Sequence, residues 1–355
     1  MLRSIKRGFL HAGKWLGLFW VARRLTGRKL RILCYHGFNS ADEVRFRPGL
    51  FIKPSTFRRR LEHLARKRFP VLPLGEALKR LQRGNLPRLA TVITIDDGFH
   101  NVHAMALPLL ESHAFPATVY VTSYYCQHPN PVFRLAVQYM FWKTVRSRIS
   151  LDGLGVDGLR PGVFERAGDL DEAMWAIIRH GETACDEPGR LALSQALAER
   201  LGVDYDRIRQ SRILSLKTPE ELGRLGDSGI DCELHTHRHR FPDDEAEATR
   251  EIAENRAVLK DFASGPLEHF CYPGGVWSER QWPWLDAAGV RSAVTCQIGL
   301  NDAATPPYAL RRFLDAEDVS QIEFEAEMAG YLELLRKARS CLTRIVGILK
   351  WRRRG

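Results

Sequence analysis

The nine residues Ala90-Thr91-Val92-Ile93-Thr94-Ile95-Asp96-Asp97-Gly98 decide the fold class of this chain. The first six are apolar or β-branched, a pattern typical of a buried strand, and the strand ends at the two aspartates. A helical pattern over residues 101–112 and a second β-branched stretch, Ala117–Thr122, follow. Strand, helix and strand in this order predict a βαβ unit and a parallel sheet.

The alternation of strands and helices continues on both sides of this unit. An apolar segment at residues 31–35 precedes it, and strand patterns at 229–234, 268–272 and 291–296 follow it, each after a predicted helix. Several of these strands end in polar or glycine-rich residues. In parallel α/β folds and barrels, functional sites are built at this carboxyl edge by residues from different strands.

Residues 124–215 interrupt the alternation. They contain helical patterns, little strand signal and no residues that suggest chemistry. We interpret this segment as a helical insertion within a domain that spans residues 31–330. Because the insertion follows the strand at 117–122, we expect it near the carboxyl edge, where it would act as a substrate lid or as an oligomer interface.

The charge of the chain lies mainly at its two ends. Nine of the 53 Lys and Arg residues fall in residues 1–31 and eight in residues 336–355, and neither segment holds an acid. The 36 remaining basic residues face 42 acidic ones, so the body carries −6 although the whole chain carries +11. A nucleic-acid binder places its basic residues on the folded domain. We therefore expect no nucleic-acid partner.

Both ends are also amphipathic. In the predicted N-terminal segment, residues 1–30, helical spacing places six apolar residues on one side of a helix: Leu2, Ile5, Phe9, Ala12, Leu16 and Phe19. The predicted C-terminal tail, residues 331–355, repeats this basic and apolar composition. The run Trp15–Ala22 is far shorter than the roughly 20 residues of a spanning helix, and a secretory signal fits poorly. We predict that both ends bind an anionic membrane surface as basic amphipathic helices; helices docked on the domain are the alternative.

Asp96 and Asp97 are the first candidates for chemistry. Adjacent acids at the end of a buried strand repel each other and lose solvation, which a bound metal ion would offset; a plain Asp-Asp-Gly turn is the alternative. The stretch His235-Thr236-His237-Arg238-His239 can present two imidazoles to one ion, or form a solvated surface loop. Together the two motifs provide two histidines, one carboxylate and a second carboxylate as base, which suits metal-assisted hydrolysis.

These motifs resemble those of the polysaccharide deacetylases, the NodB-homology group of carbohydrate esterases. Thr94–Gly98 is similar to the T-F-D-D-G motif of that family, His235–His239 matches H-[ST]-x-x-H, and Phe270–Gly275 is similar to the F-x-Y-P-x-G variant of the third motif. The resemblance covers most of residues 31–315 apart from the insertion. It implies a distorted (β/α)7-type barrel, one divalent metal, and removal of acetyl groups from N-acetylated sugars.

The resemblance also implies roles for individual residues. Asp96 would be the general base and Thr236 would brace the histidine loop by hydrogen bonding. The metal would be zinc, with cobalt or nickel as alternatives, and its ligands would be Asp97, His235 and His239. A backbone N–H near Gly274 would stabilise the oxyanion, within a substrate loop made of Tyr272, Pro273, Gly274 and Gly275.

The sequence departs from the family pattern in two places. Cys271 stands where the third motif often carries an arginine that orients the base, so this support is missing or comes from elsewhere. The usual general acid, a histidine near the C-terminal end, is also absent, because only His269 follows His239. One branch of the family supplies it from an N-terminal Tyr-His segment, so His36 is assigned as the acid, with a core or supporting histidine as the alternative. Arg312 is a supporting candidate, either as a phosphate or sugar ligand or as an ion-pair partner.

We therefore predict an enzyme, a metal-dependent glycan deacetylase that acts on carbon–nitrogen bonds other than peptide bonds. Activated water would attack the N-acetyl group of an acetamido sugar in a bacterial surface polysaccharide or its lipid-linked precursor. Seven scattered cysteines without a CxxC pair indicate a reducing compartment, so we expect a peripheral protein on the cytoplasmic face of the cell membrane. Rival functions are deacetylation or deformylation of a small soluble sugar, and non-catalytic glycan binding on the same fold.

Overall fold

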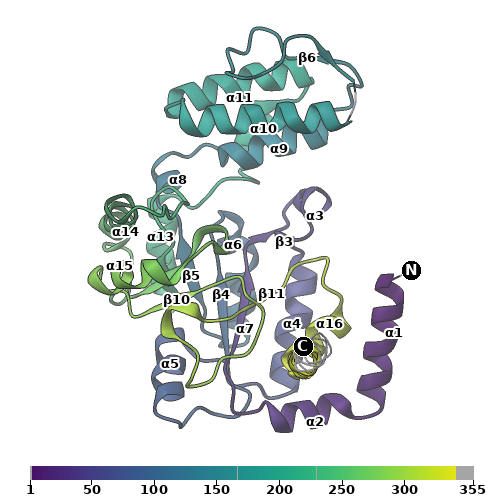
Figure 1. Cartoon of the computed structure of the whole chain (residues 1–355), viewed down its shortest axis with the longest axis vertical. Coiled ribbons are helices and arrows are strands. Elements are labelled where there is room, and N and C mark those ends of the chain that lie inside the picture. The colour runs from purple at the N-terminus through teal and green to yellow at the C-terminus, as the bar shows by residue number, and fades with distance from the viewer. Residues whose placement is uncertain (1, 166, 229, 341–355) are drawn as a thin grey trace, which may run out of the picture.

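A computed structural model describes residues 2–165, 167–228 and 230–340. Its centre is a seven-stranded parallel sheet in the order β10–β9–β8–β5–β4–β1–β11 (Figure 1). β1 and β4 are buried at every position. Because both faces of a parallel sheet are covered, such strands have nearly continuous apolar sequences. The strands are β1 (Arg31–Tyr35), β4 (Thr91–Ile95), β5 (Thr118–Val121), β8 (Asp231–Leu234), β9 (His269–Cys271), β10 (Ser292–Val294) and β11 (Phe313–Leu314).

A short segment closes this sheet into a distorted barrel. Leu310 forms a parallel bridge with Val294 of β10, and shortly afterwards β11 pairs with β1 through Leu33–Phe313 and Cys34–Leu314. The segment 310–314 therefore touches both edges of the sheet. The predicted (β/α)-type barrel is confirmed, and its closure places Arg312 between the two edge contacts.

Helices surround the barrel, and apolar side chains fill its amino end. A buried cluster there joins Ile32, Val92 and Tyr120 from the strands to Leu74 and Ala77 of one short helix. The surrounding helices are α4 (Pro54–Arg66), α5 (Leu74–Gln82), α6 (Asn101–Met105), α7 (Leu107–Ser112), α13 (Pro219–Asp227), α14 (Glu245–Leu259), α15 (Trp282–Ala287) and α16 (Gln321–Met328), with the 3-10 turns η1 (Pro273–Gly275), η2 (Glu279–Gln281) and η3 (Pro307–Ala309).

The helix predicted at residues 101–112 is broken into α6 and α7. The two helices meet at Ala106, and Pro108 lies in the first turn of α7. Proline is tolerated in a first turn, but in a helix interior it removes a backbone donor and clashes with the preceding turn. A single continuous helix was therefore the wrong expectation here.

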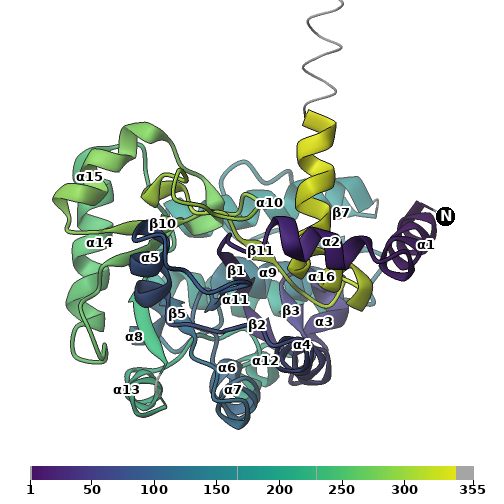
Figure 2. The same cartoon turned by 90° about the horizontal axis from the view of Figure 1, so that it is seen from below.

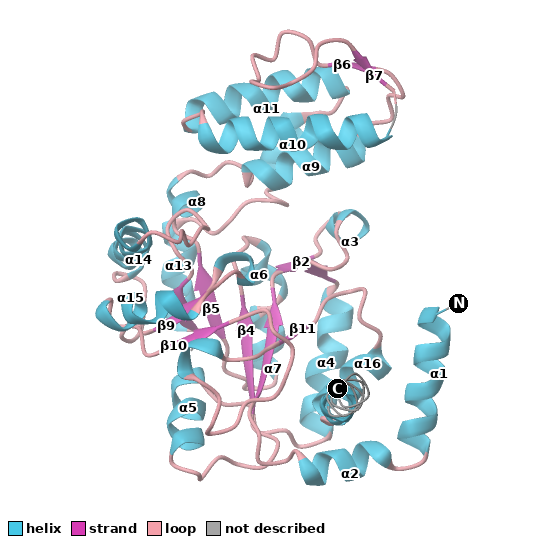
Figure 3. Cartoon of the chain, in the orientation of Figure 1, coloured by secondary structure: helices cyan, strands magenta, loops and turns pink. Residues whose placement is uncertain are grey.

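The segment between β5 and α13 forms a helical cap above the carboxyl ends of the strands (Figure 3). Three of its helices pack together around Phe133, Val137, Ile177 and Leu197. A loop after β1 reaches up to the cap, with β2 (Gly37–Phe38), α3 (Glu43–Phe46) and β3 (Phe51–Ile52). The cap contains α8 (Tyr124–Gln127), α9 (Phe133–Lys143), β6 (Ile149–Ser150), β7 (Val163–Phe164), α10 (Ala167–Thr183), α11 (Glu187–Leu201) and α12 (Tyr205–Ser211).

The N-terminal segment forms two helices, α1 (Leu2–Trp15) and α2 (Leu18–Leu25), which lie beside α16 (Figure 2). Gly17 separates them with a φ of 76°, so the expected single stripe is divided. Phe19 is buried against α16 and Tyr331, whereas Ile5, Phe9 and Leu16 are exposed. Residues 331–340 are helical; the remainder of the predicted C-terminal tail, 341–355, lies outside the described residues. None of the helices described is both long and apolar enough to cross a bilayer.

Candidate active site

Polar residues gather at the carboxyl ends of four strands. His36 follows β1, Asp96 and Asp97 follow β4, residues 235–239 follow β8, and residues 272–275 follow β9. Parallel strands bring these segments to the same edge of the barrel. The cap lies above this edge (Figure 1), so the edge and the cap together define the candidate active site.

Asp97, His235 and His239 converge on one point. Oδ1 of Asp97 lies 3.2 Å from Nε2 of His235 and 3.3 Å from Nε2 of His239. The ring centroids of the two histidines are 4.9 Å apart. His235 is buried, whereas 43 % of the His239 side chain is exposed. The point where the three side chains meet is therefore accessible from one side.

The backbone adopts unusual conformations to bring these groups together. Asp97, Thr236 and His239 have φ values of 68°, 62° and 55°, a region that residues other than glycine rarely occupy. Such residues cost about 1–3 kcal/mol each and are often found at functional sites. Oγ1 of Thr236 accepts a hydrogen bond from the backbone N–H of Arg240 at 3.1 Å. This bond braces the histidine loop in its strained form.

The hydrogen bonds of His235 leave one of its nitrogens free for a metal. Nδ1 lies 2.8 Å from the carbonyl oxygen of Cys271, and because a carbonyl only accepts, Nδ1 carries the proton. In the neutral imidazole, Nε2 then presents a lone pair toward the carboxylate of Asp97. A cation between the two groups would remove their repulsion, and an orienting bond on the second nitrogen is typical of metal-binding histidines. The donor set therefore fits a divalent metal such as zinc.

Asp96 lies next to this set but is held by different partners. Its Oδ1 and Oδ2 accept hydrogen bonds from Nη1 and Nη2 of Arg312, both at 2.7 Å. Arg312 is fully buried and also donates to Oγ1 of Thr94 and to the backbone oxygen of Thr295. Burial alone would raise the pKa of Asp96, but the Arg312 guanidinium outweighs it and keeps this pKa well below its usual range. Asp96 is therefore an ionised carboxylate next to the donor set of Asp97, His235 and His239.

Arg312 provides the guanidinium that the sequence lacks at position 271. Sγ of Cys271 lies 3.3 Å from Nη2 of Arg312, so the small thiol leaves room for an arginine that arrives from the closing segment. Of the two alternatives for Arg312, the structure contains the ion pair. The neighbouring Arg311 has an exposed side chain. The sequence pattern of residues 310–314 gave no sign of which arginine would face inward.

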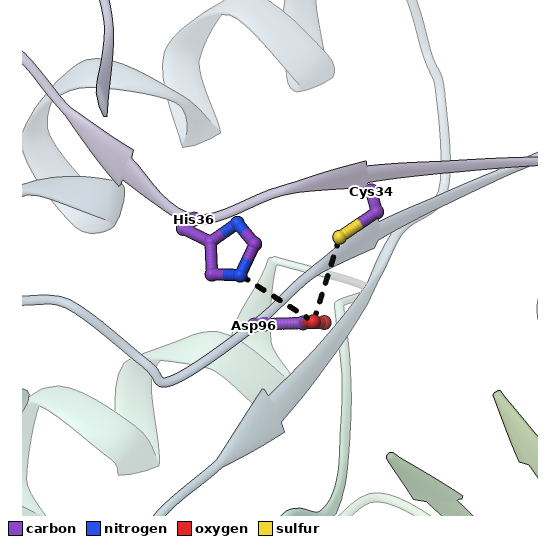
Figure 4. Close-up of side chains that lie close together, drawn as sticks. All are labelled: Cys34, His36 and Asp96. Atoms are coloured by element: carbon purple, nitrogen blue, oxygen red, sulfur yellow. Dashed lines mark hydrogen bonds and ion pairs between the residues drawn. The ribbon is translucent and has the colours of Figure 1, made fainter. Parts of the chain in front are cut away.

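His36 lies between β1 and β2 at the rim of the site. Its Nε2 is 3.8 Å from Oδ2 of Asp96, and 20 % of its side chain is exposed. Figure 4 shows His36 and Cys34 pointing toward the same carboxylate of Asp96. His36 is therefore accessible to solvent and adjacent to the second carboxylate, unlike a histidine enclosed in the core.

The loop after β9 has one backbone donor without a partner. The N–H of Tyr272 donates to the carbonyl of Val294 and the N–H of Gly275 donates to the carbonyl of Tyr272, while Pro273 has no N–H. Within the described residues, the N–H of Gly274 makes no hydrogen bond. The side chain of Tyr272 is buried and its hydroxyl donates to the carbonyl of Tyr308. Tyr272 therefore supports the loop, and Gly274 carries the available donor.

Glycine is required next to Gly274. A Cβ at position 275 would lie 2.6 Å from Sγ of Cys296, and Gly275 has a φ of 69°. A side chain at this position would thus meet both a steric clash and a disfavoured backbone conformation. The shape of the loop depends on this residue.

Cys34, Ser123 and Asn255 support the site in the structure, but no function was assigned to them from the sequence. Oδ1 of Asn255 accepts from the backbone N–H of His235 at 2.9 Å, and its Nδ2 donates to Oγ of Ser123 at 2.8 Å. Oγ of Ser123 lies 2.9 Å from Nδ1 of His237, so His237 points away from Asp97. The sequence did contain one indication that Asn255 has such a function. Asn255 is a polar residue on the buried face of α14, between Ile252 and Leu259.

Comparisons with known proteins agree with this geometry. Residues 195–293 match the family model described as polysaccharide deacetylase. This match confirms the predicted family resemblance and enzyme class. It includes His235, His239 and the loop 272–275, but because it begins at residue 195 it does not include Asp96 or Asp97. Among curated proteins, no sequence matches the chain.

Solved structures of deacetylases share the fold. The Streptococcus pyogenes deacetylase PplD in complex with acetate has a TM-score of 0.56 at 15 % identity, over 85 % of this chain and 99 % of that chain. IcaB from Ammonifex degensii has a TM-score of 0.53 at 17 % identity, over 85 % and 97 %. A de-N-acetylase from Aggregatibacter actinomycetemcomitans has a TM-score of 0.51 at 11 % identity, over 84 % and 99 %. At these identities the likeness establishes the fold.

Proposed function

We propose that this chain is a metal-dependent deacetylase that hydrolyses the N-acetyl group of an acetamido sugar. One observation carries the proposal: the donor set of Asp97, His235 and His239 lies beside a second ionised carboxylate, that of Asp96. A hydrolase needs both a metal site and a base within reach of the attacking water. A protein that only binds glycans has no need for a base beside its metal ligands.

Each group has a distinct role in the proposed reaction. Asp97, His235 and His239 would hold the divalent ion, with zinc, cobalt and nickel all compatible with this donor set. When bound there, the ion would polarise the acetyl carbonyl and lower the pKa of water. Asp96 accepts the proton that the attacking water loses. The free N–H of Gly274 donates to the developing oxyanion.

His36 completes the proton balance. It lies beside Asp96 and its side chain is partly exposed to solvent. In the proposed reaction it donates a proton to the departing amine as the carbon–nitrogen bond breaks. The products are acetate and an amino sugar.

The variant Asp96→Asn tests this assignment. Asparagine retains the shape of the side chain and an acceptor for Arg312, but it is not a base. We expect acetate release to be abolished while zinc binding, measured by calorimetry, is preserved. Substantial acetate release by the variant would exclude Asp96 as the base.

The structure weakens the main argument for a non-catalytic glycan-binding protein. That argument depended on two residues of the family pattern that the sequence lacks, the arginine that orients the base and the histidine that acts as general acid. Arg312 now occupies the arginine's place beside Asp96, and His36 lies 3.8 Å from the same carboxylate. A deacetylase or deformylase of a small soluble sugar remains the rival with the same chemistry. Comparable turnover of a soluble sugar and its lipid-linked form would favour that rival.

We also propose that the enzyme attaches to an anionic membrane surface through α1 and α2. Their inner face is docked, because Leu10, Phe19 and Ala22 pack against α16 and Tyr331, and Lys6 pairs with Glu323 at 2.7 Å. Their outer face is unusually apolar for a surface exposed to water. Its exposed large apolar side chains are Ile5, Phe9, Trp15, Leu16, Leu18, Trp20, Val21 and Leu25.

The charge of the same helices complements an anionic bilayer. Arg3 and Arg7 of α1 and Arg24 of α2 are exposed, and so is Arg28 just after α2. Each basic residue near such a surface contributes about 1 kcal/mol. Amphipathic helices with aromatic residues and arginines bind in the membrane interface. Attachment to the cytoplasmic face would bring the site to an acetylated sugar on a lipid carrier or in a polysaccharide under assembly.

Flotation with vesicles tests the attachment. The double variant Trp15→Glu/Trp20→Glu places charges on the outer face without touching the docked face. We expect it to lose flotation with vesicles of phosphatidylglycerol and phosphatidylcholine, which the wild type should show. Val145→Glu is the matched control, because Val145 is an exposed apolar residue of the cap. Equal flotation of all three proteins would exclude α1 and α2 as the anchor.

A further inference from the structure

The carboxylate of Asp96 is surrounded by donors from distant parts of the barrel. Sγ of Cys34, on β1, lies 3.4 Å from Oδ2, and Sγ of Cys271, on β9, lies 3.3 Å from the same oxygen. Arg312 contributes its bidentate bond from the closing segment. β1 and β9 are not neighbours in the sheet. Their two thiols therefore meet at one atom across the interior of the barrel.

The two oxygens of Asp96 differ in their number of donors. Oδ2 accepts from Nη2 of Arg312, lies within hydrogen-bond range of both thiols and has Nε2 of His36 at 3.8 Å, whereas Oδ1 accepts only from Nη1 of Arg312 and from no other described residue. A carboxylate oxygen has two lone pairs. Oδ2 is thus saturated within the barrel, and Oδ1 retains a lone pair for a further donor.

Both thiols are suited to donate. Cys34 and Cys271 are fully buried, and burial raises the pKa of each thiol well above its ordinary range. They remain protonated S–H groups, which are weak donors that work best toward an ionised acceptor. Packing alone would require only a side chain of similar size at each of these positions. It would not require two S–H groups to face one oxygen.

We propose that Cys34 and Cys271 are positioning residues for the catalytic base. They hold Oδ2 of Asp96 in the barrel and so leave Oδ1 as the oxygen that takes the proton from the attacking water. This inference rests on the proposed function. It extends that function, because it assigns the orientation of the base to two thiols together with Arg312 and gives Cys271 a task of its own.

The test compares removal of the donors with their replacement. Cys34→Ala, Cys271→Ala and the double alanine variant remove the S–H groups, while Cys34→Ser and Cys271→Ser retain a donor of similar size. Cys232→Ala is the matched control, because Cys232 is a buried cysteine of β8 that makes no contact with Asp96. Zinc-loaded proteins are assayed with 4-methylumbelliferyl acetate, and unfolding temperatures are measured in parallel.

We expect each alanine variant to lose about three- to tenfold in kcat with KM changed less than twofold, because a small misplacement of a catalytic group slows the chemical step. The serine variants should recover most of this loss, and Cys232→Ala should keep the wild-type kcat. An active wild type with unchanged kcat in the double alanine variant would overturn this inference alone. A serine variant as slow as the alanine variant would also overturn it, since packing and not the donor would then matter.

A wild type that binds zinc but does not hydrolyse the probe or release acetate from any acetylated sugar would contradict the proposed function, and this inference with it. If the double alanine variant does not fold, the single variants give the same comparison. The unfolding temperatures then distinguish two effects. A loss of packing should lower the unfolding temperature of Cys232→Ala as well, whereas a loss of kcat should appear only in the Cys34 and Cys271 variants.

Discussion

Arg312 and Asp96 face each other in a bidentate pair, with Nη1–Oδ1 and Nη2–Oδ2 both at 2.7 Å and both side chains buried. Two parallel bonds fix the plane of the carboxylate as well as its position. Arg312 belongs to the segment that bridges β10 and β1. The closure of the barrel and the orientation of the candidate base therefore depend on the same few residues.

Replacing Arg312 by methionine should destabilise the protein strongly. The change leaves the carboxylate of Asp96 buried without its partner, and breaking a buried pair in this way costs about 3–5 kcal/mol. The added change Asp96→Asn removes the unpaired charge, so the double variant should regain part of the loss. Urea unfolding of the single and double variants measures both effects.

Arg311→Met is the control for this prediction, because the Arg311 side chain is exposed. Its effect should stay within about 0.5 kcal/mol, as is usual for surface substitutions. A double variant that is no more stable than Arg312→Met would show that the loss comes from packing rather than from the unpaired carboxylate.

Metal-stripped protein should bind one zinc or cobalt ion, and the site should be lost in both Asp97→Ala and His235→Ala. Each change removes one of three converging donors. The ion should also stabilise the wild type, by about 2.7 kcal/mol at a free concentration 100 times the Kd. Calorimetric titration and thermal unfolding with and without metal measure the two effects.

His237→Ala serves as the matched variant for the metal site. His237 belongs to the same loop, but its Nδ1 contacts Ser123 rather than Asp97. It should therefore keep its metal affinity within a few fold. If Asp97→Ala and His237→Ala bind zinc equally well, the metal is held elsewhere and the proposed centre is wrong.

The parts of the fold in which a short apolar strand is followed by polar residues could be predicted from the sequence. β4 and the aspartates after it are one apolar run ended by polar residues, and the His235–His239 stretch follows a strand in the same way. Parallel strands bring such ends together, so their proximity follows from topology alone.

Contacts made across the barrel could not be predicted in this way. Arg312 reaches Asp96 over 216 positions in the sequence, and only the closure of the sheet decides that it faces inward. Cys34 and Cys271 meet at Asp96 for the same reason. The N-terminal helices were misjudged as one stripe, because Gly17 turns the chain and the burial of Phe19 depends on Tyr331, a residue more than 300 positions away.

Lys217→Met should stabilise the protein at neutral pH. Lys217 is fully buried and its Nζ has no hydrogen-bond partner among the described residues. Burial lowers the pKa of Lys217 to about 8. Between about pH 8 and 10.5 the unfolded chain therefore binds one proton more than the folded one at this residue, and the stability of the wild type rises with pH by up to about 1.4 kcal/mol per unit.

The comparison of variant and wild type isolates this effect from other titrations. At pH 7 the methionine variant should be more stable by about 1–3 kcal/mol, and the difference should shrink as the pH approaches 10. Urea unfolding at pH 7, 8.5 and 10 gives the three differences. A difference that stays constant with pH would show that Lys217 does not titrate on unfolding.

The cap should be held over the site by a clamp centred on Asp42. Oδ1 of Asp42 accepts from the hydroxyl of Tyr139 at 2.7 Å, its Oδ2 pairs with Lys143, and Nη1 of Arg47 donates to Gln138 at 2.8 Å. All three cap residues belong to α9, and the loop that carries Asp42 begins directly after His36 and β2. The clamp thus ties the cap to the rim of the site.

Asp42→Ala should open this side of the cap without unfolding the barrel. Loss of the hydrogen bonds to a charged acceptor, about 1.4 kcal/mol or more, predicts about tenfold faster hydrogen exchange in residues 133–143. Strands β4 and β8 should exchange as in the wild type. Asp206→Ala is the matched control, because Asp206 pairs at the surface of α12 with Arg209 and with no other side chain in the described part of the protein. Unchanged exchange of α9 in Asp42→Ala would mean that packing of Phe46 against Tyr139 and Trp142 holds the cap without the clamp.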